Sequence, residues 1–435
     1  MNYREQIDQN DMSPFQVTAV VICILAGIVA GFAILILPFT APAIAESWNL
    51  PPDRLGALLS ASLVGMMLGA IVIAPFADRI GRRKVLLFSM TLVTLGLLYS
   101  GFAGDATRLM IARLMTGLGI GGSLASINTL IAEYCSNKWR DLAIGIYISG
   151  GALAGILGGA LTAYLVAHFD WSAAFVFGGL VSGLMTLGLA LWMPESVDYL
   201  LTRRPGNALE RINKLLGKMH IAAMDALPDA SEEAGEAGNI WIIFSRPYLL
   251  KSFLMWLSVF MVFTGFYFIM SWTPKLLVDA GWTLQQAIFA TIVINIGGVL
   301  SGFGFGYLSP RIGYRRTIRG FLIFTCVFVL LFGWAGDDYS LRFVLPIFLG
   351  FFLFGTLTSQ YSLLPRLYPT TIRNTGTGWA TGIGRLGGMA APYVAGQMLA
   401  AGWAGFDLYY VYAVTSLISL VAVSFIWMVT KDEPA

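Results

Sequence analysis

The sequence is poor in charge, histidine and cysteine. Only 12% of the 435 residues are charged, against about 25% in soluble domains, and 57% are hydrophobic, which excludes a soluble globular protein. Its three cysteines, Cys23, Cys135 and Cys326, form no CxxC pair and have no histidine close by, so we expect no metal site. Phosphate-loop and hydrolase motifs are absent too, which argues against an enzyme and against a cofactor.

The net charge of +3 does not indicate a nucleic-acid partner. The basic residues lie in short segments between apolar blocks and form no continuous face.

The hydrophobic residues come in blocks of roughly twenty, the length that a helix needs to cross a bilayer. The sequence therefore predicts an all-α polytopic membrane protein with twelve transmembrane helices. The predicted spans are 17–38, 55–75, 85–104, 108–133, 142–167, 172–193, 250–276, 284–308, 317–336, 340–365, 373–400 and 408–430.

Two short motifs occur twice, about 232 positions apart. Asp78–Arg83 follows the second span and Pro310–Arg316 follows the eighth, while Glu133–Arg140 is matched by Arg366–Arg373. Six spans separate the copies, so the two halves have the same orientation in the membrane, and a substrate cavity is expected between them.

The repeat divides the chain into three parts. We expect a six-helix half over 1–193, a cytoplasmic linker with one or two surface helices over 194–248, and a second six-helix half over 249–435. With the N-terminus inside, 21 of the 27 Lys and Arg residues lie on the cytoplasmic side and four lie outside. Because Lys and Arg accumulate in cytoplasmic loops, both termini are predicted to be cytoplasmic.

Several motifs resemble those of the major facilitator superfamily, and the resemblance covers nearly the whole chain. They are Ala77–Lys84 between spans two and three, Arg113–Gly121 in span four and Pro194–Ser196 after span six. Within that superfamily the chain resembles the bacterial aromatic acid:proton symporters. The supporting segments are Thr40–Ala45, Glu133–Cys135, Tyr368–Thr370 and Gly384–Gly388.

The first span departs from the symporter pattern. Where those symporters carry Asp-Gly-Phe-Asp, this sequence has alanines at Ala30 and Ala33. The resemblance implicates that aspartate pair in proton coupling, so we expect coupling to be weakened or absent here.

Two arginines fall inside predicted spans, and burying an ionisable group there costs about 2.5–3.5 kcal/mol on insertion scales. Of the 24 acidic residues only Glu133 touches a span, so Arg385, near the middle of span eleven, has no obvious carboxylate partner. We expect Arg385 to bind a substrate anion, the alternative being hydrogen bonds to backbone carbonyls. For Arg113, nearer the outside, the carbonyl alternative is stronger.

Other polar and aromatic residues of the spans are candidates for lining the pocket, although each alone is more often a packing or interfacial residue. They are Asn128, Tyr147, Tyr267, Trp272, Asn295, Gln360 and Trp379.

The charged loops are candidates for gating. The resemblance implies that Asp78, in the loop with Gly81 and Arg82, caps the start of the eleventh helix and latches the cytoplasmic side. Charges that could complete this latch are Glu133, Arg140, Arg366 and Arg373. The alternative is a charge cluster that only sets membrane topology.

The sequence thus predicts a secondary transporter of small organic anions, most simply aromatic carboxylates, that acts as a monomer in a bacterial inner membrane. Its partners would be the anion, protons and the lipid bilayer. Two alternatives are an efflux transporter of the same fold, which would more often carry a membrane-embedded acid, and a membrane receptor that binds ligand without flux.

Overall fold

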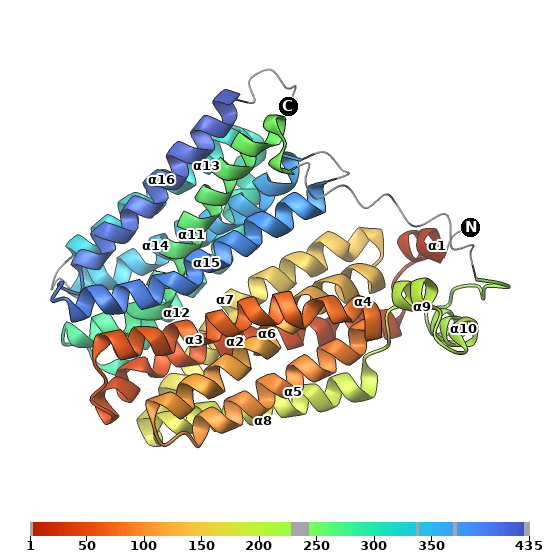
Figure 1. Ribbon diagram of the computed structural model, residues 1–435, viewed down its shortest axis with the longest axis horizontal. Coiled ribbons are helices and arrows are strands. Elements are labelled where there is room, and N and C mark those ends of the chain that lie inside the picture. The colour runs from red at the N-terminus through yellow and green to blue at the C-terminus, as the bar shows by residue number, and fades with distance from the viewer. Residues whose placement is uncertain (1–2, 228–242, 336–338, 369–371, 430–435) are drawn as a thin grey trace. The chain divides into compact units, whose positions relative to one another are not determined.

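The computed structural model describes residues 3–227, 243–335, 339–368 and 372–429, and within them all regular elements are helices (Figure 1). Twelve of the described helices have 20 residues or more and coincide with the twelve predicted spans. They are α2 (Pro14–Ser47), α3 (Pro52–Val72), α5 (Arg82–Gly101), α6 (Ala106–Tyr134), α7 (Asn137–His168), α8 (Trp171–Trp192), α11 (Arg246–Asp279), α12 (Leu284–Ile312), α13 (Tyr314–Trp334), α14 (Tyr339–Leu363), α15 (Arg373–Ala400) and α16 (Asp407–Val429). The predicted all-α architecture is confirmed.

Eleven helices of the described chain are long and apolar enough to cross a membrane, and α15 is the long helix outside that set. At 28 residues it would reach about 42 Å, so its length is sufficient. The composition of α15 keeps it out of that set, because its first half is rich in Thr and Gly and contains Arg385.

The short helices are α1 (Tyr3–Gln9), α4 (Ala77–Ile80), α9 (Val197–Arg203) and α10 (Ala208–Lys218), with 3₁₀ turns at Ala74–Phe76 and Leu364–Arg366. The last two α-helices, α9 and α10, are linker helices of the kind expected from the sequence. The remainder of the linker, 228–242, lies outside the described residues.

The chain folds into two compact units. The first comprises 1–34, 64–154 and 172–235, and the second comprises 35–63, 155–171 and 236–435. Helices α2, α3 and α7 therefore contribute to both units. The division at 193 and 249 inferred from the sequence repeat stays a prediction.

Within the second unit, α3 and α15 cross at a pair of glycines. A Cβ added to Gly56 would lie 2.7 Å from the carbonyl oxygen of Pro392, and one added to Gly396 would lie 2.5 Å from that of Pro52. Only glycine permits this backbone approach, which is typical of close helix packing in membranes.

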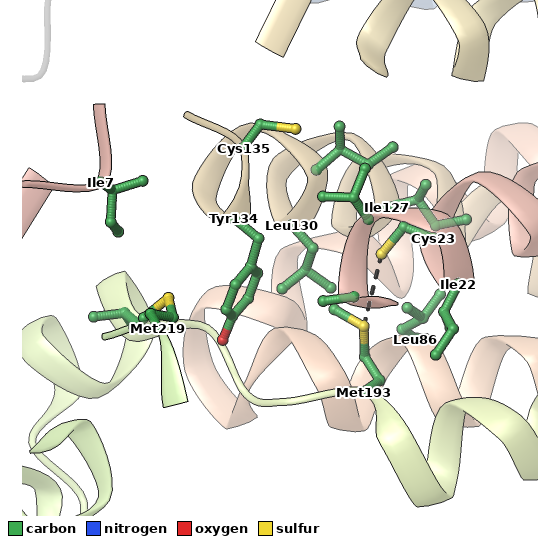
Figure 2. Packing of buried hydrophobic residues seen from close by; sticks show 14 of the residues in the cluster. Ile7, Ile22, Cys23, Leu86, Ile127, Leu130, Tyr134, Cys135, Met193 and Met219 are labelled. Carbon is green, nitrogen blue, oxygen red and sulfur yellow. Dashed lines mark hydrogen bonds between the residues drawn. The ribbon is translucent and has the colours of Figure 1, made fainter. Parts of the chain in front are cut away.

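The core of the first unit holds the linker helices in place. Figure 2 shows Tyr134, at the end of α6, in one buried cluster with Met219, which follows α10, and shows the Cys23 thiol directed at the Met193 sulfur. The Tyr134 hydroxyl donates a 2.6 Å hydrogen bond to the Glu195 carbonyl. The segment that leaves α8 is thereby fixed to the end of α6.

Candidate functional site

Glycines set the position of Arg385 by letting α15 pack tightly on α11. A Cβ on Gly384 would lie 2.5 Å from the Val259 side chain, and one on Gly388 would lie 2.5 Å from the Tyr267 ring. A Cβ on Gly387 would collide with the Phe260 carbonyl. Substitution of these glycines would push the helices apart, so the arginine is carried on a closely fitted pair of helices.

Arg385 is a cation without a matching anion. Its side chain is partly buried, its Nη1 atom is buried, and among the described residues that atom has no hydrogen-bond partner and no carboxylate forms an ion pair with the guanidinium. Arg385 interacts electrostatically with the phenol groups of Tyr267 on α11 and Tyr361 on α14.

Aromatic rings surround these two tyrosines. The Phe263 ring centroid lies 6.0 Å from that of Tyr267 and 6.3 Å from that of Tyr361, and Phe266 packs edge-on against Tyr267 at 5.4 Å. One region of the second unit therefore holds a guanidinium, two phenol groups and apolar rings. This chemistry suits a flat ring that bears a negative group.

The structure gives other partners to two more candidate pocket residues of the second unit. The Trp272 indole N–H donates to the Pro392 carbonyl at 3.0 Å, and Gln360 accepts a 3.1 Å hydrogen bond from Ser258, both in fully buried positions. Such satisfied interior groups suit packing between helices. Their assignment to the substrate pocket stays a prediction.

The remaining pocket candidates also occupy distinct environments. Trp379 stacks on Trp256 with centroids 6.0 Å apart, and Asn295 donates to the Thr291 carbonyl at 2.8 Å. In the first unit, Asn128 is exposed on α6 and the Tyr147 ring packs on Gly27. Tyr267 is thus the predicted residue that the structure brings together with Arg385.

Arg113 is fully buried on α6 and faces the backbone of α2. Its Nη2 donates a 2.5 Å hydrogen bond to the Ala33 carbonyl, and its guanidinium carbon lies 5.6 Å from the centre of the Phe175 ring. This hydrogen bond is of the kind expected if Arg113 is satisfied by backbone carbonyls, the alternative to a role in ligand binding. Ala33 itself is fully buried, and so is Ala30 one turn earlier.

A charge cluster around Arg82, the Arg82 cluster, holds the loop between α3 and α5. Arg82 forms an ion pair with the buried carboxylate of Glu133, and its Nη1 donates to the Ser196 hydroxyl at 3.0 Å. Asp78 and Asp198 lie 3.6 and 3.9 Å from the guanidinium. Three carboxylates around one arginine tie α4, α5, α6 and α9 together.

A similarity to known proteins covers nearly all of these elements. The sequence model described as Major Facilitator Superfamily matches residues 23–392 and, in a second match, 255–435.

The chain belongs to the major facilitator superfamily.

Its relatives are transporters. The 4-hydroxybenzoate transporter PcaK of Pseudomonas aeruginosa is 31% identical over 91% of this chain and 89% of the relative. The gallate transporter of Pseudomonas putida is 30% identical over 92% and 90%, and the benzoate transport protein of Acinetobacter baylyi is 25% identical over 97% and 92%. The expected family resemblance is confirmed, and the protein is a multi-pass transporter rather than an enzyme.

Solved structures show the same superfamily fold. A partially occluded, inward-open structure of the Escherichia coli xylose transporter XylE superposes with a TM-score of 0.77 at 16% identity, covering 97% of this chain and 98% of that one.

In this superfamily member the predicted latch residues have varied partners. The Asp78 side chain is 74% exposed and pairs with Arg82, while its capping of the eleventh long helix stays a prediction. Arg140 forms an ion pair with Asp8, Arg366 lies 4.1 Å over the Tyr314 ring, and Arg373 is exposed.

Several partners in these contacts carry no signal in the sequence. Asp8 is far in the sequence from its partner Arg140, and Asp198 is far from its partner Arg82. No local pattern therefore connects either pair. The sequence does single out Glu195, because this residue belongs to the Pro194–Ser196 motif after span six. Its carboxylate accepts hydrogen bonds from the backbone N–H groups of Arg83 and Ser196, at 2.9 and 3.0 Å.

Glu133→Gln is expected to destabilise the protein by about 1–3 kcal/mol, because Arg82 would lose the buried one of its three carboxylate partners but would keep Asp78 and Asp198. Thermal unfolding in detergent measures the change. The control is Asp105→Asn, which removes an exposed partner of Arg108 and should cost under about 1 kcal/mol. Equal melting temperatures for the two variants would contradict a structural role for the Arg82–Glu133 pair.

Gly81→Ala is expected to lower stability by about 1–3 kcal/mol, because the backbone φ of Gly81 is +113° and a Cβ there would collide with the Glu195 carboxylate. The repeat offers a matched control in Gly313, which has φ +92° but open space around its Cα. Gly313→Ala should therefore cost less in the same melting experiment. A second control, Gly145→Ala, has neither strain nor contact and should leave the melting temperature nearly unchanged.

Proposed function

We propose that this protein transports small aromatic carboxylates across the inner membrane of a bacterium, as a monomer with both termini in the cytoplasm. Its two six-helix halves, 1–193 and 249–435, would expose the site alternately to the two sides, as in other transporters built from repeats. The names of the relatives support the substrate class.

The observation that carries the proposal is the partly buried guanidinium of Arg385, whose buried Nη1 has no hydrogen-bond partner among the described residues and whose charge acts on Tyr267 and Tyr361. Guanidinium stays charged under all physiological conditions and binds a carboxylate through two parallel hydrogen bonds. Phe263 would contact the aromatic ring, and the phenol hydroxyls would bind ring substituents.

The same geometry argues against efflux of cationic compounds. An efflux transporter of cations would more often carry an unpaired membrane-embedded acid, whereas the buried acid Glu133 on α6 is paired with Arg82 and the site proposed here is built around the cation Arg385. A substrate anion supplies the missing charge, which lowers the cost of keeping the arginine at this depth.

We further propose that transport is coupled to protons weakly or not at all. Ala30 and Ala33 stand where the aromatic acid symporters have carboxylates, and neither methyl group can carry a proton. Exchange of internal for external substrate and downhill flux need no proton carrier and would persist.

Counterflow in proteoliposomes tests the proposal. Vesicles loaded with unlabelled 4-hydroxybenzoate should take up the labelled compound transiently, whereas vesicles without protein, or loaded with xylose, should not. Binding of the label without counterflow would replace the transporter by a receptor. Absence of both binding and counterflow for 4-hydroxybenzoate, benzoate and gallate would contradict the substrate class.

A further inference from the structure

A cavity of about 330 Å³ lies within the first unit, far from Arg385 in the sequence. Its lining residues lie where α8 ends and the chain turns into the linker helices α9 and α10. Its walls come from the start of α2, the start of α5, the segment Leu191–Glu195 and one face of α10.

The cavity is strongly basic. Its lining includes four cationic side chains and one carboxylate, that of Glu195. The cationic residues are Arg83, Arg211, Lys214 and Lys218. Glu195, whose carboxylate accepts hydrogen bonds from the backbone N–H groups of Arg83 and Ser196, offsets one of these positive charges, so the lining keeps a clear excess of cations.

Three of the cations are presented by a fixed helix. Arg211, Lys214 and Lys218 are spaced at i, i+3 and i+7, which places them on one face of α10. The opposite face carries Ile212 and Leu216, both fully buried in the core that contains Tyr134 and Met193. Because that face is anchored, the basic face cannot turn away from the cavity.

Arg83 adds a donor that the protein leaves unused. Its Nη2 donates to the Ala190 carbonyl at 2.6 Å, while its Nε is buried and has no hydrogen-bond partner among the described residues. Because Arg83 lines the cavity, the positive charge of its guanidinium favours an anionic oxygen there.

The rim of the cavity is apolar and belongs to a membrane-spanning helix. Leu191 and Trp192 close α8 and are 64% and 61% exposed. Tryptophan is enriched where a span meets the headgroup region of the bilayer. A site for a soluble anion needs no such rim, whereas a lipid needs both a basic pocket and an apolar surface beside it.

We propose that this cavity binds the phosphate-bearing headgroup of an anionic phospholipid from the cytoplasmic leaflet. The basic face of α10 and Arg83 contact the phosphate oxygens, and the acyl chains lie over Leu191 and Trp192. The lipid thereby ties the linker helices to the end of α8, because it contacts both.

Native mass spectrometry of the purified full chain tests the proposal. The protein is equilibrated with equal amounts of phosphatidylglycerol and phosphatidylcholine, and the retained lipids are counted. We expect phosphatidylglycerol to be enriched, and the triple variant Arg211→Gln/Lys214→Gln/Lys218→Gln to lower that enrichment about tenfold. The exposed Lys214 also permits the single variant Lys214→Glu, which leaves the core face of α10 untouched and should lower the enrichment as well.

The control variant Lys84→Gln/Lys138→Gln/Arg316→Gln removes the same charge from positions outside the cavity lining and should retain the enrichment. Equal retention of the two lipids by the unaltered chain would overturn the proposal, and so would enrichment that survives both α10 variants. A parallel arm adds millimolar phosphate or pyrophosphate. Binding of these anions with complete displacement of the lipid would replace the lipid by a soluble phosphate ligand.

Discussion

Arg385→Gln is expected to weaken binding of 4-hydroxybenzoate by about 10²–10⁴-fold. The variant removes a charge-assisted pair and leaves the substrate carboxylate buried without a counter-ion, which costs about 3–5 kcal/mol. Titration of the purified protein with the ligand, followed by calorimetry, gives the Kd directly. Counterflow at a substrate concentration well below that Kd should fall in proportion.

Two comparisons separate a lost charge from a damaged fold. 4-Hydroxybenzamide has the shape of the substrate without its charge, so the Arg385→Gln variant should bind the amide about as well as the unaltered chain does. Arg385→Lys keeps the charge but loses the two parallel hydrogen bonds, so its affinity should be intermediate. An Arg385→Gln variant that binds the acid with unaltered affinity would contradict a carboxylate role for this arginine.

Much of the fold could be predicted from the sequence because bilayer thickness dictates the length of apolar blocks. All twelve predicted spans correspond to long helices, including α15, whose Thr, Gly and Arg content lowers its hydropathy. Helix ends were less predictable. The helix that contains span five starts at Asn137 rather than at 142, since its first turns extend beyond the apolar block.

The candidate site was only partly predictable. Arg385 stands out in the sequence because a charge in a span without a matching acid needs a partner. Tyr361 does not stand out, since its place in this region depends on how α14 packs against α11, where its ring contacts that of Phe263. Similarly, Asp198 reaches Arg82 because the linker is fixed to Tyr134, a contact that no local pattern reveals.

The Ala30→Asp/Ala33→Asp variant is expected to gain proton-driven accumulation that the unaltered chain lacks. The two positions lie one turn apart on α2, and the Ala33 carbonyl already accepts a hydrogen bond from Arg113. Arg113 is therefore placed to offset part of the cost of a carboxylate there, about 2.5–3.5 kcal/mol for an isolated charge. With one proton per substrate, a pH difference of one unit supplies about 1.4 kcal/mol, or tenfold accumulation.

The measurement is uptake of labelled 4-hydroxybenzoate into proteoliposomes that are acidic outside, with the membrane potential held at zero by potassium and valinomycin. Both proteins should catalyse counterflow, but only the double variant should concentrate the label, and a protonophore should abolish that accumulation. The matched control is Ala26→Asp, which places a carboxylate one turn before Ala30 on the same buried face of α2. This variant adds charge without recreating the symporter pattern. Accumulation by the unaltered chain would show that its proton carrier lies elsewhere, and accumulation by Ala26→Asp would show that any carboxylate on this face suffices.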